Sequence, residues 1–170
     1  KIEATQNSDR EFKIIKKDLG STDVIPIDFE FDPDEKDFLK IALNVLKDFE
    51  CKPDIGYDVS ITSKIPINSG LSSSSALIVA WVNFLLNMFT DYEVTSNLLA
   101  EISYRIEVEE VGGSGGKMDQ YTIANGKTIY LDTKTDGIIP FNHKLCDMIV
   151  GVSNQSKDTQ GLLKKLKENA

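Results

Sequence analysis

The chain has 170 residues, of which 41% are hydrophobic and 27% charged, as in an ordinary globular protein with a buried core. Its net charge of −8 argues against nucleic acid as the main partner, because binding nucleic acid requires a basic surface. Cys51 and Cys146 are too few for a disulfide framework, so we expect a reducing, cytoplasmic setting.

The first third of the chain predicts two strands and a helix. Residues 11–16 are predicted to form a short strand, and residues 24–31 alternate as in a half-buried strand, with Pro26 favouring a sheet edge. Asp32 followed by Pro33 is typical of a helix start, with Asp32 as the cap. Apolar residues at helical spacing then form a stripe: Phe38, Leu39, Ala42, Val45, Leu46 and Phe49.

A glycine- and serine-rich loop separates an alternating strand, residues 57–61, from an apolar helix that ends near Phe89. Gly70 allows close approach of a ligand, and the free N–H groups of a helix N-terminus favour an anion such as phosphate. The alternative is an ordinary loop whose serines only cap the helix. Because Asn83 and Asn87 interrupt the apolar run, we expect no membrane span.

A second glycine-rich loop, residues 112–116, follows another helix, for which residues 90–93 have capping-box spacing. It leads directly into Lys117, Met118, Asp119 and Gln120, so that Asp119 could face a ligand's reactive hydroxyl; the alternative is a surface turn with a solvated Asp119. Short strands are predicted at residues 128–131, 138–141 and 148–152, and an amphipathic helix at residues 159–169.

The order of residues in the serine loop resembles the phosphate-binding motif of the GHMP kinases, which include galactokinase, homoserine kinase and mevalonate kinase. The motif runs Pro66, Gly70, Leu71, Ser72, Ser73, Ser74, Ser75, Ala76. Glu107, twelve residues before Asp119, and the run Gly116 to Gln120 resemble the segment that galactokinase-type sugar kinases carry after this loop. The segment Ser156 to Thr159 also resembles one that opens the second domain of sugar kinases.

This resemblance implies an ATP-dependent phosphorylation of a sugar hydroxyl, with ATP and a monosaccharide as ligands. Ser74 and Glu107 would hold Mg²⁺, and Asp119 would orient or deprotonate the hydroxyl that attacks the γ-phosphorus. Gly116 would let its loop approach the sugar. The ATP phosphates would lie against Asn68, Ser69, Gly70, Leu71, Ser72, Ser73, Ser74, Ser75 and Ala76.

The resemblance also implies an α+β fold with a mixed sheet covered by helices, like the second domain of ribosomal protein S5. Residues 1–145 would form the N-terminal ATP-binding domain, and residues 146–170 would begin a truncated second domain. Asn68, Ser69 and Ser75 replace smaller residues of the family pattern, and Lys117 replaces an apolar one. The family's Pro-Gly-Arg-type segment and closing glycine-rich motif are not found, so we expect a kinase fragment that is inactive alone.

Two other functions stay open at this point. The chain could be a non-catalytic relative that binds a sugar or a nucleotide without transferring phosphate. It could instead be an unrelated α+β interaction domain whose serine loop is only a helix cap, although two loops at this spacing argue against that. His143 is the only histidine, so no histidine-based metal site or catalytic triad is expected.

Overall fold

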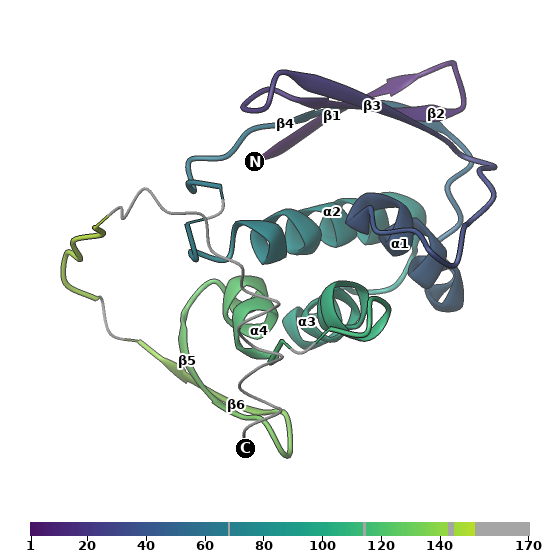
Figure 1. Ribbon diagram of the computed structural model, residues 1–170. Coiled ribbons are helices and arrows are strands. Elements are labelled where there is room, and N and C mark those ends of the chain that lie inside the picture. The colour runs from purple at the N-terminus through teal and green to yellow at the C-terminus, as the bar shows by residue number, and fades with distance from the viewer. Residues whose placement is uncertain (68, 114, 143–144, 152–170) are drawn as a thin grey trace. The chain divides into compact units, whose positions relative to one another are not determined.

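The computed structural model describes residues 1–67, 69–113, 115–142 and 145–151 (Figure 1). These residues form two compact units. The first unit comprises residues 1–65 and 80–94, and the second comprises residues 66–79 and the chain from residue 95 onward. Helix α2, Ser73–Phe89, contributes its first two turns to the second unit and the remainder to the first.

The first unit is built on a four-stranded mixed sheet, visible in Figure 1 as the ribbons labelled β1 to β4. The strands are β1 (Ile2–Asn7), β2 (Glu11–Lys16), β3 (Ser21–Pro26) and β4 (Gly56–Ile61). Their order is β1-β4-β2-β3, in which β4 and β2 run parallel and the two outer pairs are antiparallel. The predicted α+β class with a mixed sheet is therefore confirmed.

The core of the first unit lies between one face of this sheet and two helices. Helix α1 (Phe38–Val45) continues into a 3₁₀ turn, η1 (Leu46–Phe49), and packs beside the later turns of α2. Trp81 of α2 is fully buried, donates its indole N–H to the Leu39 carbonyl at 3.2 Å and meets the Phe12 ring edge-on at 5.4 Å. The other buried side chains here include Ile14, Ile25, Ile41, Val59, Val82, Leu85 and Leu86.

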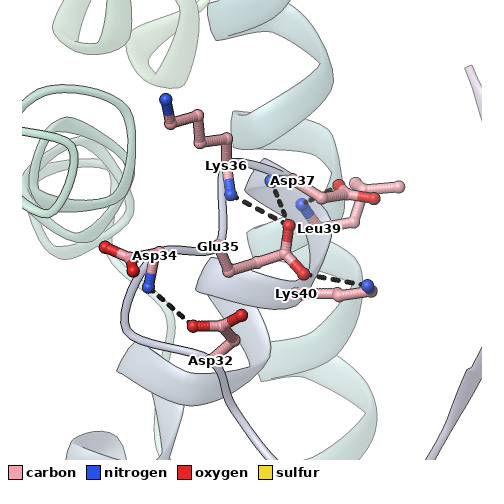
Figure 2. Close-up of polar contacts among 7 residues, drawn as sticks. All are labelled: Asp32, Asp34, Glu35, Lys36, Asp37, Leu39 and Lys40. Carbon is pink, nitrogen blue, oxygen red and sulfur yellow. Dashed lines mark hydrogen bonds and ion pairs between the residues drawn. The ribbon is translucent and has the colours of Figure 1, made fainter.

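Helix α1 begins five residues later than the sequence predicted. Asp32 is not the cap, because its carboxylate accepts the Asp34 backbone N–H within a turn at 2.9 Å. Asp37 occupies the N-cap instead and accepts the Leu39 backbone N–H at 2.9 Å (Figure 2). Glu35 bridges the turn and the helix: its carboxylate accepts from the backbone of Lys36 and Asp37 and from the Lys40 ammonium.

In the sheet of the first unit, one predicted strand has different bounds and one strand was not predicted. Strand β3 ends at Pro26, and the alternation continues to residue 31 in irregular backbone, where Ile27 and Phe29 are still half-buried. Strand β1 was missed because four of its six side chains are exposed, so it carries no apolar alternation. It is held by its antiparallel pairing with β4.

The second unit contains helix α3 (Ser96–Tyr104), a π-helical turn η2 (Arg105–Glu109), helix α4 (Met118–Asn125) and a hairpin. Thr95 caps α3 by accepting the Leu98 backbone N–H at 3.2 Å, so the predicted capping box at residues 90–93 is wrong. The strands predicted at residues 128–131 and 138–141 are present as β5 (Thr128–Asp132) and β6 (Gly137–Phe141), and the two pair in an antiparallel hairpin.

Residues 148–151 lie outside any strand, contrary to the strand predicted there. The predicted helix at residues 159–169, the segment at residues 156–159 and His143 lie outside the described residues. The boundary between residues 145 and 146 therefore stays a prediction. In the part of the chain that the structure describes, no helix is long and apolar enough to cross a bilayer.

Candidate active site

The serine loop enters helix α2 through two left-handed backbone conformations. Gly70 has φ +75° and Ser72 has φ +54°. Ser69 stiffens the preceding turn by donating its hydroxyl to the Pro66 carbonyl at 2.7 Å. The first intrahelical bond runs from the Ala76 N–H to the Ser72 carbonyl at 3.0 Å, so the amides before Ala76 remain available at the positive end of the helix.

The side chains of this loop are not equivalent. Ser69, Gly70, Leu71 and Ser74 are exposed, whereas Ser75 is buried, so that its hydroxyl faces the interior of the unit. Ser72, Ser73 and Ala76 are half-buried, and Asn68 lies outside the described residues. Among the described members of the predicted phosphate loop, Ser74 is thus the one whose hydroxyl is exposed at the start of α2.

Ser74 and Glu107 are in direct contact. The Ser74 hydroxyl donates to Glu107 Oε1 at 2.6 Å, although the two residues are 33 positions apart in the chain. The second carboxylate oxygen, Oε2, accepts the side-chain amide of Gln120 at 2.6 Å. One carboxylate therefore joins the first turn of α2 to the first turn of α4.

Glu107 lies on the π-helical turn η2, where the Glu110 N–H bonds to the Arg105 carbonyl five residues back at 3.0 Å. A π-turn inserts an extra residue into a helix and rotates the side chains that follow, and such turns are frequent at functional sites. Ile106 and Val108 on either side of Glu107 are buried, which anchors the turn and leaves the carboxylate half-exposed.

The glycine-rich loop packs against the same turn. A Cβ atom at Gly113 would lie 3.2 Å from the Val108 carbonyl oxygen, and one at Gly115 would lie 3.2 Å from the Val108 side chain. Gly112 has φ +61°. A Cβ atom at Gly116, in contrast, would meet no atom of the described residues within 4 Å, so packing against them does not explain that glycine.

Lys117 connects three elements of the second unit. Its ammonium contacts both carboxylate oxygens of Asp136 in the β5–β6 turn, at 2.8 and 2.7 Å, and lies 5.6 Å from the centre of the Tyr104 ring. The hydrogen bond to Asp136 raises the pKa of Lys117 above its usual value. The sequence could not reveal this ion pair, because its partners are 19 residues apart.

Asp119 and Gln120 occupy consecutive positions in the first turn of α4 and therefore point in directions about 100° apart. Gln120 is buried and contacts Glu107, whereas Asp119 is half-buried and has no hydrogen bond or ion pair to the described residues. The sequence singled out Asp119 and indicated no separate role for Gln120. Helix α4 is only eight residues long, so its sequence gives too weak a pattern to predict that Gln120 is buried.

The donor set suits a hard cation. Ser74 and Glu107 offer a hydroxyl and a carboxylate whose oxygens lie 2.6 Å apart, close enough for both to contact one ion. Mg²⁺ is usually bound by one or two carboxylates together with substrate phosphates and water. Within the described ranges, no three His, Cys, Asp or Glu side chains cluster as a metal cage. The pair fits Mg²⁺ as a partner of nucleotide phosphates.

A half-open pocket of about 330 Å³ in the first unit contains none of these residues. Cys51 is part of its wall, and burial raises the pKa of this thiol to about 11, so it is neutral at physiological pH. The lining consists of Ile27, Phe29, Leu43, Lys47, Cys51, Lys52 and Pro53.

Comparison with known proteins identifies the family. The family model described as "GHMP kinases N terminal domain" matches residues 37–127, more than half of the chain. The chain belongs to the GHMP kinase family. This match contains the serine loop, Glu107 and Asp119, the three features on which the sequence-based resemblance rested.

Curated relatives include both sugar and mevalonate kinases. The chain is 36% identical to the galactokinase of Streptococcus mutans over 109 residues, covering 61% of this chain and 27% of that protein. It is 29% identical to the mevalonate kinase of Thermococcus sibiricus over 132 residues, covering 78% of this chain and 38% of that protein. The chain thus spans well under half the length of either relative.

A solved structure shows the same fold. The Lactococcus lactis galactokinase complexed with galactose aligns with a TM-score of 0.70 at 22% identity, covering 99% of this chain and 49% of that protein. The α+β architecture of the GHMP kinases is thereby established for this chain.

Proposed function

We propose that this chain is part of an ATP-dependent kinase that phosphorylates a sugar hydroxyl, as galactokinases do. The observation that carries the proposal is the 2.6 Å contact between Ser74 and Glu107. It joins the start of a helix, which favours phosphate, to a carboxylate, which favours the metal that accompanies nucleotide phosphates. A serine that only capped its own helix would bond to the backbone of that helix rather than to a residue 33 positions away.

In this proposal the backbone amides at the start of α2 bind the phosphates of ATP. Ser74 and Glu107 hold Mg²⁺, which when bound neutralises phosphate charge during transfer. Asp119 orients the acceptor hydroxyl and takes its proton. The hydroxyl oxygen then forms a bond to the γ-phosphorus, and the bond from that phosphorus to the bridging oxygen breaks to release ADP.

The choice of a sugar as the acceptor rests on the run Met118, Asp119, Gln120 and on the twelve-residue interval between Glu107 and Asp119, which resemble the galactokinase branch. Identity to relatives does not choose between the acceptors. The galactokinase of Streptococcus thermophilus is 31% identical over 134 residues, and the mevalonate kinase described above is 29% identical over 132 residues. Mevalonate is therefore the acceptor to be tested against the sugars.

A non-catalytic relative is the second candidate, and the state of Lys117 favours it. Transfer requires cationic charge around the moving phosphoryl group. Lys117, the basic residue that immediately follows the glycine-rich loop, has its ammonium engaged by Asp136 and Tyr104. A nucleotide or sugar sensor needs no such charge and would use the same loops for binding alone.

An ATP-consumption assay separates the candidates. The 170-residue chain, and the same chain with the flanking sequence of its open reading frame, are incubated with Mg·ATP and either a panel of hexoses or mevalonate. We expect hexose-dependent turnover only with the longer protein, and its loss in Asp119→Asn with nucleotide binding retained. Turnover with mevalonate alone would reject the sugar assignment. Nucleotide binding without turnover in either protein would favour the sensor.

A further inference from the structure

The side chain of Gln120 has two ends in very different situations. Its Nε2 donates to Glu107 Oε2 at 2.6 Å. A carboxylate only accepts hydrogen bonds, so the amide must present its NH₂ group to Glu107 and its oxygen to the opposite side. The orientation of the Gln120 amide is therefore fixed by Glu107.

The other end of the amide is unsatisfied. Gln120 is 2% exposed, and its Oε1 has no hydrogen-bond donor among the described residues. A buried acceptor without a donor destabilises the folded state, whereas an apolar side chain of similar volume carries no such cost. Packing alone would therefore favour methionine or leucine at this position, and the presence of glutamine calls for another explanation.

That explanation lies in the geometry of Glu107. Ser74 contacts one oxygen of the carboxylate and Gln120 contacts the other, so the plane of the carboxylate is held from two helices. Each oxygen keeps a second lone pair. The Ser74 oxygen also keeps lone pairs that can face a cation, so Ser74 can serve as a ligand itself. Gln120 can hold the carboxylate throughout.

We propose that Gln120 is a positioning residue that orients the Glu107 carboxylate toward the divalent cation. This inference rests on the proposed function, because it requires that Glu107 binds the metal. Residues that hydrogen-bond to metal ligands commonly change metal affinity 10- to 100-fold when they are replaced. Gln120 acts through Glu107 and touches neither substrate nor metal.

The test measures Mn²⁺ binding in the presence of ADP by electron paramagnetic resonance. Thermal unfolding of the same proteins is measured alongside it. We expect Gln120→Met to weaken Mn²⁺ binding 10- to 100-fold while leaving the melting temperature unchanged or higher. Glu107→Gln should abolish the protein-dependent binding of Mn²⁺. A merely structural glutamine would instead lower the melting temperature without changing Mn²⁺ affinity.

Ser103 provides a matched control. It lies on α3, is fully buried, and its hydroxyl has no partner among the described residues, so Ser103→Ala also removes an unsatisfied group. It should leave Mn²⁺ affinity unchanged. If Glu107→Gln loses Mn²⁺ while Gln120→Met binds it within twofold of wild type, the inference is wrong and the proposed site stands. If the wild-type protein itself binds no Mn²⁺ with ADP, the proposed metal site fails and the inference fails with it.

Discussion

The Ser74 hydroxyl donates a 2.6 Å hydrogen bond to the carboxylate of Glu107. Ser74 lies in the first turn of α2, and Glu107 lies on the π-helical turn that follows α3. The contact brings together the two sequence motifs that suggested a kinase, and Gln120 extends it to the helix that carries Asp119. Residues far apart in the sequence therefore meet at one place in the second unit.

The left-handed conformation of Gly70 should matter for nucleotide binding as well as for stability. Gly70→Ala introduces a side chain at φ +75°, which costs about 1 kcal/mol, and should also displace the loop that leads into α2. Gly20→Ala is the matched control, since Gly20 has φ +64° in the β2–β3 turn and open space around it.

Urea unfolding and titration with an ATP analogue would measure both effects. We expect similar losses of stability for the two variants, with weakened nucleotide binding only for Gly70→Ala. Equal nucleotide affinity in the two variants would argue that the loop plays no part in binding.

The observed start of α1 predicts unequal effects for two aspartates. Asp37→Ala removes the N-cap hydrogen bond to the Leu39 amide and should cost about 1 kcal/mol of stability. Asp32→Ala affects an exposed turn before the helix and should cost less than about 0.5 kcal/mol. Chemical denaturation of both variants measures the two losses of stability. A larger loss for Asp32→Ala would support the helix start predicted from the sequence, with Asp32 as the cap.

The Glu35 carboxyl predicts a pH-dependent contribution to stability. The hydrogen bond from Lys40, with those from the Asp37 and Lys36 amides, lowers the pKa of Glu35 from 4.5 to about 2 (Figure 2). Because the folded-state pKa is lowered, the contribution is complete above about pH 4.5 and is lost as the pH falls toward 2.

Glu35→Gln should therefore be less stable than wild type at pH 7, and the difference should shrink as the pH approaches 2. Unfolding midpoints in urea across this range, with an NMR titration of Glu35, provide the measurement. A difference that stays constant with pH would show that the charge of Glu35 is not responsible.

The sequence predicted those parts of the fold that carry apolar periodicity. Strand β4 and helix α2 were found because their buried positions repeat at the spacing of a strand or a helix. Strand β1 pairs through its backbone and keeps most side chains in solvent, so no pattern marks it. The N-cap of α1 was predicted wrongly for a related reason. Asp32 and Asp37 are equally good capping residues, and only the path of the folded chain decides between them.

The candidate site was predictable only in part. The resemblance to the GHMP kinases gave Ser74, Glu107 and Asp119 as candidates, because it rests on motifs that are contiguous in the sequence or separated by a fixed interval. Their roles stay predictions. Gln120 contacts Glu107, 13 residues before it, and Lys117 contacts Asp136, 19 residues after it. Each contact joins two different elements, so a single sequence does not reveal it.

The most direct test of the account is a calorimetric titration of the chain with a non-hydrolysable ATP analogue, with and without Mg²⁺. If the start of α2 binds phosphates and Ser74 with Glu107 holds the metal, Mg²⁺ should raise the affinity of the wild-type protein at least about tenfold, or about 1.4 kcal/mol. The same addition should change the affinity of Glu107→Gln little. Binding that is independent of Mg²⁺, or equally enhanced in Glu107→Gln, would contradict the proposed site.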